Sequence, residues 1–361
     1  MRRPRLSRLM PVLAAALLLP GLLPGVASAA RPAVTSPTPT ISFLIGSCWV
    51  SIDGGPATTE ITGILRKADG TLKGTLKDTS DASGSAELCF KRLVLGGDTL
   101  TLKAGGKTIR TLAIHRFALL PNRNTDVLTV KGKPNDKLAI ERSECTVDGK
   151  ACTGIEDKQI TIGPKGTFTW NLKGTQDITG GDKFILEWTN PLGDSVGIRV
   201  HAPSFTATIG LPTVTGWAAP GTPVTVTVRR AGVIVASGAA TARPDSTWTA
   251  KLRKNGAEVL VQEGDVLKAS VASTATLHAD LTAGFAGDGI SGVCFPDVDL
   301  AADLTDPLGS STWYYYAHSD GNGNYLLSSL DLLTRAGWTA TVRCTDDAGD
   351  TIARQLLIPN A

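Results

Sequence analysis

The sequence predicts an all-β protein built from four β-sandwich domains in tandem. Apolar residues alternate with polar ones in short runs along most of the 361-residue chain, and Gly, Pro, Asn and Asp separate the runs. In the clearest run, Val224, Val226 and Val228 alternate with threonines, which is the pattern of a strand buried on one face. Many short strands at such spacing are typical of β-sandwiches, and two landmarks recur in four units.

The first landmark is a glycine followed by Asp or Trp directly before an alternating strand. It occurs at Gly97-Asp98, Gly181-Asp182, Gly264-Asp265 and Gly337-Trp338, with spacings of 84, 83 and 73 residues. The second landmark is a turn of small residues upstream, which an aromatic residue follows in three units, as in Ser246-Thr247-Trp248. A period above about 50 residues indicates repeated whole domains rather than a solenoid.

The first 30 residues are predicted to be a secretory signal peptide. Four arginines precede an apolar run from Met10 to Leu23, and Ala27-Ser28-Ala29 supplies the small residues of a cleavage site. Prolines interrupt this run, and no later stretch approaches the ~20 apolar residues of a spanning helix. We therefore expect a secreted protein, extracellular or at the cell surface, without a membrane span after signal cleavage.

Residues 31–40 are predicted to form an extended Pro/Thr-rich linker, because Pro, Ser and Thr dominate this stretch. From the landmarks we expect four repeat domains at 41–113, 114–206, 207–285 and 286–361.

Net charge argues against a nucleic-acid partner. The whole chain has 36 basic and 33 acidic side chains, but four of the arginines lie in the signal peptide, which has no acidic residue. The mature chain is therefore close to neutral. The basic character that nucleic-acid binding requires is absent.

Six cysteines in an exported chain are predicted to form disulfides, for which fifteen pairings exist in principle. Cys145 and Cys152 flank an Asp148-Gly149 turn that would place them opposite each other in a hairpin. Of the other four cysteines, Cys48 and Cys89 lie in the first unit, and Cys294 and Cys344 lie in the last. A zinc site is the weaker alternative, because no Cys-x-x-Cys spacing or nearby histidine pair is present.

A family resemblance appears in the last unit. The turn Asp320–Tyr325, the strand Gly337–Val342 and the turn Thr345–Thr351 follow one another as in bacterial immunoglobulin-like (Ig-like or carboxypeptidase-regulatory-like) repeats of secreted or surface proteins. The sequence resembles this family well over 286–361, fairly over 207–285, and elsewhere through internal alignment. The resemblance implies extracellular Ig-like sandwiches that serve as spacers, adhesion modules or accessory domains, usually without catalysis, and implies no particular ligand.

The candidate ligand-binding residues are aromatic. All four tyrosines lie in the last unit, as Trp313-Tyr314-Tyr315-Tyr316 and Tyr325. On a strand, Trp313 and Tyr315 face one way while Tyr314 and Tyr316 face the other. One pair is expected to fill the core and the other to lie exposed, where rings about 7 Å apart can stack on a sugar or an aromatic partner. The alternative is packing with nothing bound.

We expect no metal site. His115, His201 and His278 occupy similar places in successive units, about 20 Å or more apart, which one metal cannot bridge. His318 is alone. Asp320–Tyr325 resembles the start of a calcium loop but lacks its glycine and its final acidic residue, so we interpret it as a turn.

No nucleophile elbow, zinc-protease helix or phosphate loop is present, and we predict no catalytic residue, no cofactor and no enzyme. The function predicted is a structural or adhesive one, secreted or at the bacterial cell surface, with a cell-surface or matrix protein or a polysaccharide as partner. The alternative is an extracellular carbohydrate-binding or accessory module of a degradative system. An uncharacterised hydrolase is a third, weaker hypothesis.

Overall fold

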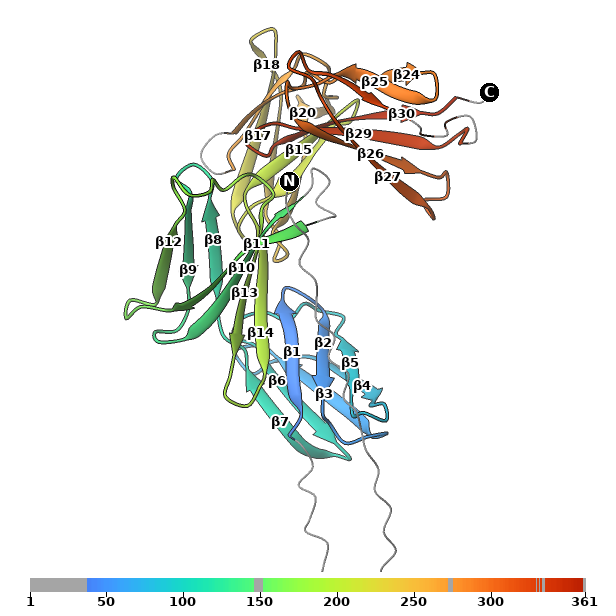
Figure 1. Ribbon diagram of the computed structural model, residues 1–361. Helices are drawn as coiled ribbons and strands as arrows, with labels where there is room; N and C mark the ends of the chain where they lie inside the picture. Colours follow the sequence, from blue (N-terminus) through green and yellow to red (C-terminus); the bar gives the residue numbers. More distant parts are fainter. Residues whose placement is uncertain are drawn as a thin grey trace, which may run out of the picture. The chain divides into compact units, whose positions relative to one another are not determined.

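The computed structural model describes residues 38–145, 152–271, 275–328, 330, 332 and 335–359 (Figure 1). This part of the chain is all-β, as predicted, and its strands β1 to β30 form six sheets. None of the described residues belongs to a helix long and apolar enough to cross a bilayer. The predicted signal peptide and most of the predicted linker lie outside the described residues.

The strands fall into four successive groups, which we call modules 1 to 4. Module 1 contains β1 (Thr40–Ile45), β2 (Trp49–Asp53), β3 (Glu60–Arg66), β4 (Leu72–Thr79), β5 (Ala86–Cys89), β6 (Thr99–Ala104) and β7 (Lys107–Ala113). Module 2 contains β8 (Ala118–Asn122), β9 (Val127–Lys131), β10 (Lys137–Cys145), β11 (Cys152–Thr161), β12 (Thr167–Asn171), β13 (Lys183–Thr189) and β14 (Ser195–His201).

Modules 3 and 4 continue the series. Module 3 contains β15 (Ser204–Ile209), β16 (Thr213–Trp217), β17 (Pro223–Arg230), β18 (Val233–Thr241), β19 (Thr247–Lys251), β20 (Arg253–Lys254), β21 (Ala257–Glu258), β22 (Val266–Ala269) and β23 (Ala275–His278). Module 4 contains β24 (Gly284–Ala286), β25 (Gly289–Val293), β26 (Asp299–Thr305), β27 (Thr312–His318), β28 (Asn324–Leu327), β29 (Thr339–Thr345) and β30 (Thr351–Leu357).

All four modules have one sandwich topology. In module 1 the first, second and fifth strands pair as β1-β2-β5, and the others as β4-β3-β6-β7. Modules 2, 3 and 4 repeat this order, and module 3 adds the short strands β20 and β21. Residues that alternate along the strands fill the cores, and Val224, Val226 and Val228 of β17 are buried as predicted. The predicted domain boundaries stay a prediction, although those at 206/207 and 285/286 fall inside β15 and β24.

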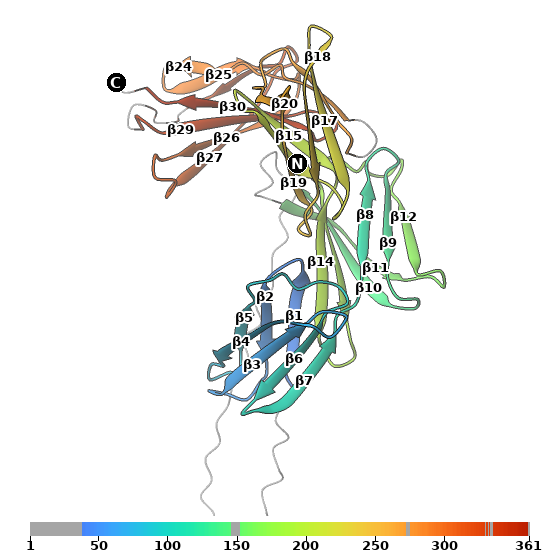
Figure 2. The same cartoon turned by 180° about the vertical axis from the view of Figure 1, so that it is seen from behind.

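The modules are joined in pairs by parallel strand pairing, which the sequence did not predict. Strand β1 pairs in parallel with β14, and β15 pairs in the same way with β30. Modules 1 and 2 therefore share the seven-stranded sheet β11-β10-β13-β14-β1-β2-β5 (Figures 1 and 2). Modules 3 and 4 share the sheet β19-β16-β15-β30-β29-β26-β27. Because equivalent strands form both seams, the second pair of modules repeats the first.

The aspartate of the Gly-Asp landmark has a structural role. Asp182 Oδ2 accepts hydrogen bonds from Arg142 Nη2 at 2.8 Å and from the Thr179 N–H at 3.2 Å. The side chains of Asp182 and Arg142 are each only 3% exposed. Asp98 pairs with Lys73, and Asp265 with Arg230, in the same way. The carboxylate thus closes the turn before the strand that follows the landmark and neutralises a cation from the third or fourth strand of the same sheet.

Replacing Asp182 with Ala leaves Arg142 buried without its charge partner. We expect the free energy of unfolding, measured with guanidinium chloride, to fall by about 3–5 kcal/mol. The matched control is Glu60→Ala, whose pair with Lys77 is 58% and 61% exposed at its two side chains, and which should change stability by less than about 1 kcal/mol. Equal losses in the two variants would contradict this role of the landmark.

A second set of buried aspartates lies at the seams. Asp194 Oδ1 accepts the N–H of Ile41 in β1 at 3.0 Å, and Arg110 of β7 donates to Asp194 Oδ2. Asp350 Oδ1 accepts the N–H of Phe205 in β15 at 2.9 Å, with Arg123 of module 2 as its cation. Each carboxylate precedes the last strand of its module and binds the first strand of its partner.

Asp346 lies in the same β29–β30 turn as Asp350. Its Oδ1 accepts the N–H groups of Ala348 at 3.0 Å and of Asp350 at 2.9 Å. Burial raises the pKa of Asp346 to about 6, and the neighbouring Asp350 carboxylate acts in the same direction. The folded chain therefore binds this proton more tightly than the unfolded chain, in which the pKa of an aspartate is about 3.9.

The sign of the resulting pH dependence can be tested with Asp346→Asn. The raised pKa contributes stability below about pH 4, and this contribution is lost as the pH rises through about 6. The variant should therefore gain stability relative to the wild type between pH 4 and pH 7.5 in urea unfolding. The control Asp306→Asn should show almost no pH dependence over this range, because hydrogen bonds from Ser310 lower the pKa of Asp306, so that its contribution to stability is lost only below about pH 4. A difference independent of pH would contradict the assignment.

Candidate functional site

Strand β27 carries the predicted aromatic run at the edge of a sheet. Among the described residues it pairs only with β26, and it ends the seven-stranded sheet of modules 3 and 4. Its seven residues, Thr312–His318, include no proline, lysine, arginine or carboxylate. Edge strands usually carry such residues because they discourage pairing with other chains. β27 therefore presents an uncharged aromatic edge.

The face of β27 that points toward the core holds a cation. Arg335 lies over the rings of Trp313, Tyr315 and Trp338, with centroid distances of 5.0, 5.6 and 5.4 Å. Its Nη1 also donates to the hydroxyl of Tyr315 at 2.7 Å. Trp338 occupies the landmark position that is Asp in the other modules. In module 4, cation–π contacts thus replace the buried carboxylate–cation pair.

The opposite face of β27 is exposed. Tyr314 and Tyr316 are 44% and 53% exposed and lie across from Asp303 and Ala301 of β26. Trp313, on the core-facing side, is also 54% exposed, whereas Tyr315 packs against the core. The expectation that one alternating pair fills the core thus holds for Tyr315 but is wrong for Trp313. Ligand binding by Trp313, Tyr314, Tyr315 and Tyr316 stays a prediction.

Tyr325 does not belong to a contact surface, contrary to the prediction. It is 4% exposed in β28, and its hydroxyl donates to the carbonyl of Thr282 at 2.7 Å. Burial raises the pKa of this phenol. The aromatic residue that follows the small-residue turn is a core residue in this module, and Trp248 is its buried counterpart in module 3.

Two of the histidines and the Asp320 turn have structural partners. His115 stacks on Trp188 at 4.0 Å, and His201 stacks on Trp217 at 4.1 Å. Burial lowers the pKa of His201. Asp320 Oδ1 accepts the N–H groups of Asn322 and Asn324, both at 2.8 Å, as in a tight turn. Among the described residues, no group of three or more His, Cys, Asp or Glu side chains is arranged to hold a metal ion.

Two of the predicted disulfides are formed. Cys48 bonds to Cys89 between neighbouring strands of module 1, and Cys294 bonds to Cys344 across the two sheets of module 4. Cys145 and Cys152 are register partners in the β10–β11 hairpin, but their side chains lie outside the described part of the chain. Disulfides fit an extracellular location, because they persist in oxidising compartments.

Comparisons with known proteins find similar solved structures but no family. No protein-family model and no curated protein matches the chain. A tetra-tandem repeat from the extending region of a large adhesion protein is 14% identical, with 88% of this chain and 98% of that chain covered and a TM-score of 0.18. A Ca2+-stabilised adhesin of an Antarctic bacterium that binds ice is also 14% identical, with 91% and 100% covered and a TM-score of 0.15.

The native α-2-macroglobulin of Escherichia coli is 9% identical. The match covers 90% of this chain but only 30% of the macroglobulin, with a TM-score of 0.20. TM-scores this low mean that the chains do not superpose as wholes. These likenesses therefore carry no argument about the function of this chain.

Proposed function

We propose that the chain is a non-enzymatic protein, secreted or held at the bacterial cell surface, with a structural or adhesive role. The observation that carries the proposal is the exposed, uncharged aromatic edge of β27, on which Tyr314 and Tyr316 point away from the core. An exposed apolar strand at a sheet edge is a typical place for contact with another molecule. The disulfides of modules 1 and 4 support an extracellular location.

Tight junctions between the modules support a load-bearing or spacing role. Only Ala202 and Pro203 separate β14 from β15, and His201 stacks on Trp217 across this junction. The two shared sheets connect modules by backbone hydrogen bonds rather than by flexible linkers. Such an array would act as a spacer that presents β27 of module 4 for contact.

A carbohydrate-binding role is the second candidate. It is favoured by Tyr314 and Tyr316, because residues two apart on a strand place their rings about 7 Å apart on one face. Aromatic rings at this spacing can stack on successive sugar rings. The carbohydrate-binding role requires sugar for binding, whereas the structural or adhesive role does not.

The contact can be tested with the double variant Tyr314→Ala/Tyr316→Ala of the full chain. We expect its binding to intact cells, matrix protein or polysaccharide, measured on coated surfaces, to be at least tenfold weaker than that of the wild type. The control Leu192→Ala removes an equally exposed apolar side chain, 60% exposed, in module 2 and should bind normally. Unchanged binding by the double variant would contradict the proposal, and signal that depends on sugar would favour the carbohydrate role.

A further inference from the structure

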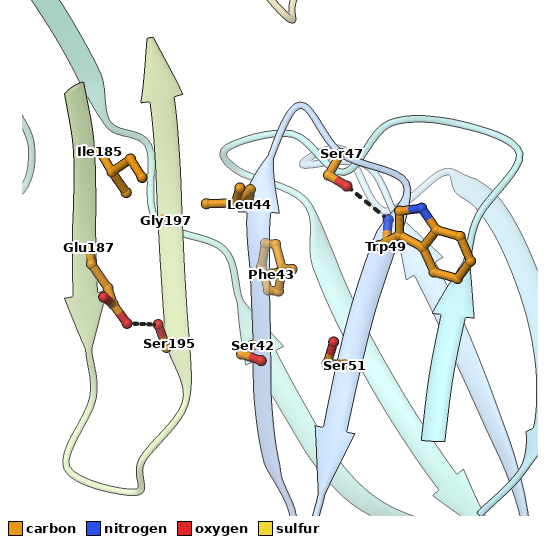
Figure 3. A pocket seen from close by; sticks show the side chains of 10 residues that line it. All are labelled: Ser42, Phe43, Leu44, Ser47, Trp49, Ser51, Ile185, Glu187, Ser195 and Gly197. Atoms are coloured by element: carbon orange, nitrogen blue, oxygen red, sulfur yellow. Dashed lines mark hydrogen bonds between the residues drawn. The ribbon is translucent and has the colours of Figure 1, made fainter. Parts of the chain in front are cut away.

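A groove of about 340 Å³ crosses the seam between modules 1 and 2 on the outer face of their shared sheet (Figure 3). Strands β1 and β2 of module 1 contribute Ser42, Trp49 and Ser51 to its lining, and β13 and β14 of module 2 contribute Glu187, Ser195 and Gly197. This volume lies at the lower end of the range of small-ligand sites, about 300–1,000 Å³. Both modules line the groove, so neither module forms it alone.

Three hydroxyl groups form a row along the groove. Ser195 is the register partner of Ser42, which in turn is the register partner of Ser51. Neighbouring strands lie about 4.8 Å apart, so the three side chains project from adjacent strands at that spacing. Each hydroxyl can donate and accept a hydrogen bond.

A ring and a carboxylate lie at opposite ends of the groove. The Trp49 side chain is 56% exposed, and the backbone N–H of Trp49 donates to Ser47 Oγ at 3.0 Å. The adjacent Cys48 is bonded to Cys89, which faces Trp49 in the next strand. On the other side, the Glu187 carboxylate accepts a hydrogen bond from Ser195 Oγ. Figure 3 shows the indole and the carboxylate on either side of Ser42.

Gly197 has no side chain to project into the middle of the groove. A Cβ at this position would lie 2.7 Å from Leu44 Cδ2, so the glycine lets Leu44 lie flat across the seam. Glycine weakens a strand interior and often marks a place where another group approaches closely. Here it leaves a shallow floor between Trp49 and Glu187.

The second seam provides an internal comparison. By register, Thr206, Thr215 and Thr351 take the places of the three serines, so the hydroxyl row belongs to both seams. The places of Trp49, Glu187 and Gly197, however, are taken by Thr213, Arg343 and Ala353. Two modules can therefore pair in parallel without the ring, the carboxylate or the glycine. These three features of the first seam need another explanation.

We propose that this groove binds an uncharged oligosaccharide. A pyranose ring has an apolar C–H face that suits the exposed indole of Trp49. Its hydroxyl groups can exchange hydrogen bonds with Ser42, Ser51 and the Glu187 carboxylate. The same carboxylate disfavours anionic sugars. Because the ligand contacts both modules, its binding also stabilises the seam. The inference does not rest on the contact proposed for β27.

The experiment uses the full secreted chain and an array of neutral gluco-, galacto- and manno-oligosaccharides, followed by calorimetric titration of the best-bound oligosaccharide. We expect Trp49→Ala to weaken binding at least tenfold and Glu187→Gln to weaken it several-fold. Trp49 and Glu187 are exposed, so both variants should fold, which their thermal melting curves verify. The wild type should melt at a higher temperature with the sugar than without it.

Phe285→Ala is the matched control, because it removes an exposed aromatic side chain, 41% exposed, from β24 of module 4. It should leave this binding unchanged. Absence of binding to every neutral sugar would overturn the inference. Binding that persists in both Trp49→Ala and Glu187→Gln would overturn it as well, and loss of the binding in Tyr314→Ala/Tyr316→Ala instead would place the sugar on β27.

Discussion

A buried carboxylate at each seam is the interaction on which the paired arrangement of modules depends. Asp194 and Asp350 are each 1% exposed at the side chain, and each accepts a backbone N–H from the first strand of the neighbouring module and a bond from an arginine. Removing any one member would leave a buried polar group or charge without a partner, at a cost of about 1–3 kcal/mol or more. The aspartate, the guanidinium and the parallel strand pair therefore form as one unit.

The two seams differ in where the arginine originates. Arg110 reaches Asp194 from module 1, within the first pair of modules, whereas Arg123 reaches Asp350 from module 2, outside the second pair. The contact is reinforced by the Gly180 N–H, which donates to the carbonyl of Ala348 at 2.8 Å. The second seam thus takes its cation from the first pair. The four modules are consequently coupled in a way that a chain of independent domains would not be.

The sequence predicted the elements of the fold better than their assembly. Alternation in β17 and the Gly-Asp landmark depend on local burial and turn geometry, so β6, β13, β22 and β29 follow the landmark as expected. The parallel seams, and the groove of Trp49 and Glu187, join residues about 140 positions apart that no local pattern connects. One sequence feature could have indicated the seams: a Gly-Asp pair, separate from the landmark, ends the turns before β14 and β30.

The most direct test of the paired arrangement is a cross-link between register partners at the first seam. In the full chain with Ser42→Cys and Ser195→Cys, the two strands are about 4.8 Å apart, within the Cα range of about 4.4–6.8 Å that a disulfide spans. Mass spectrometry of tryptic peptides should then find the two positions joined within one chain under mild oxidation. Ser42→Cys with Thr169→Cys should give no such bond. A cross-link no more frequent between 42 and 195 than in this control would contradict the shared sheet.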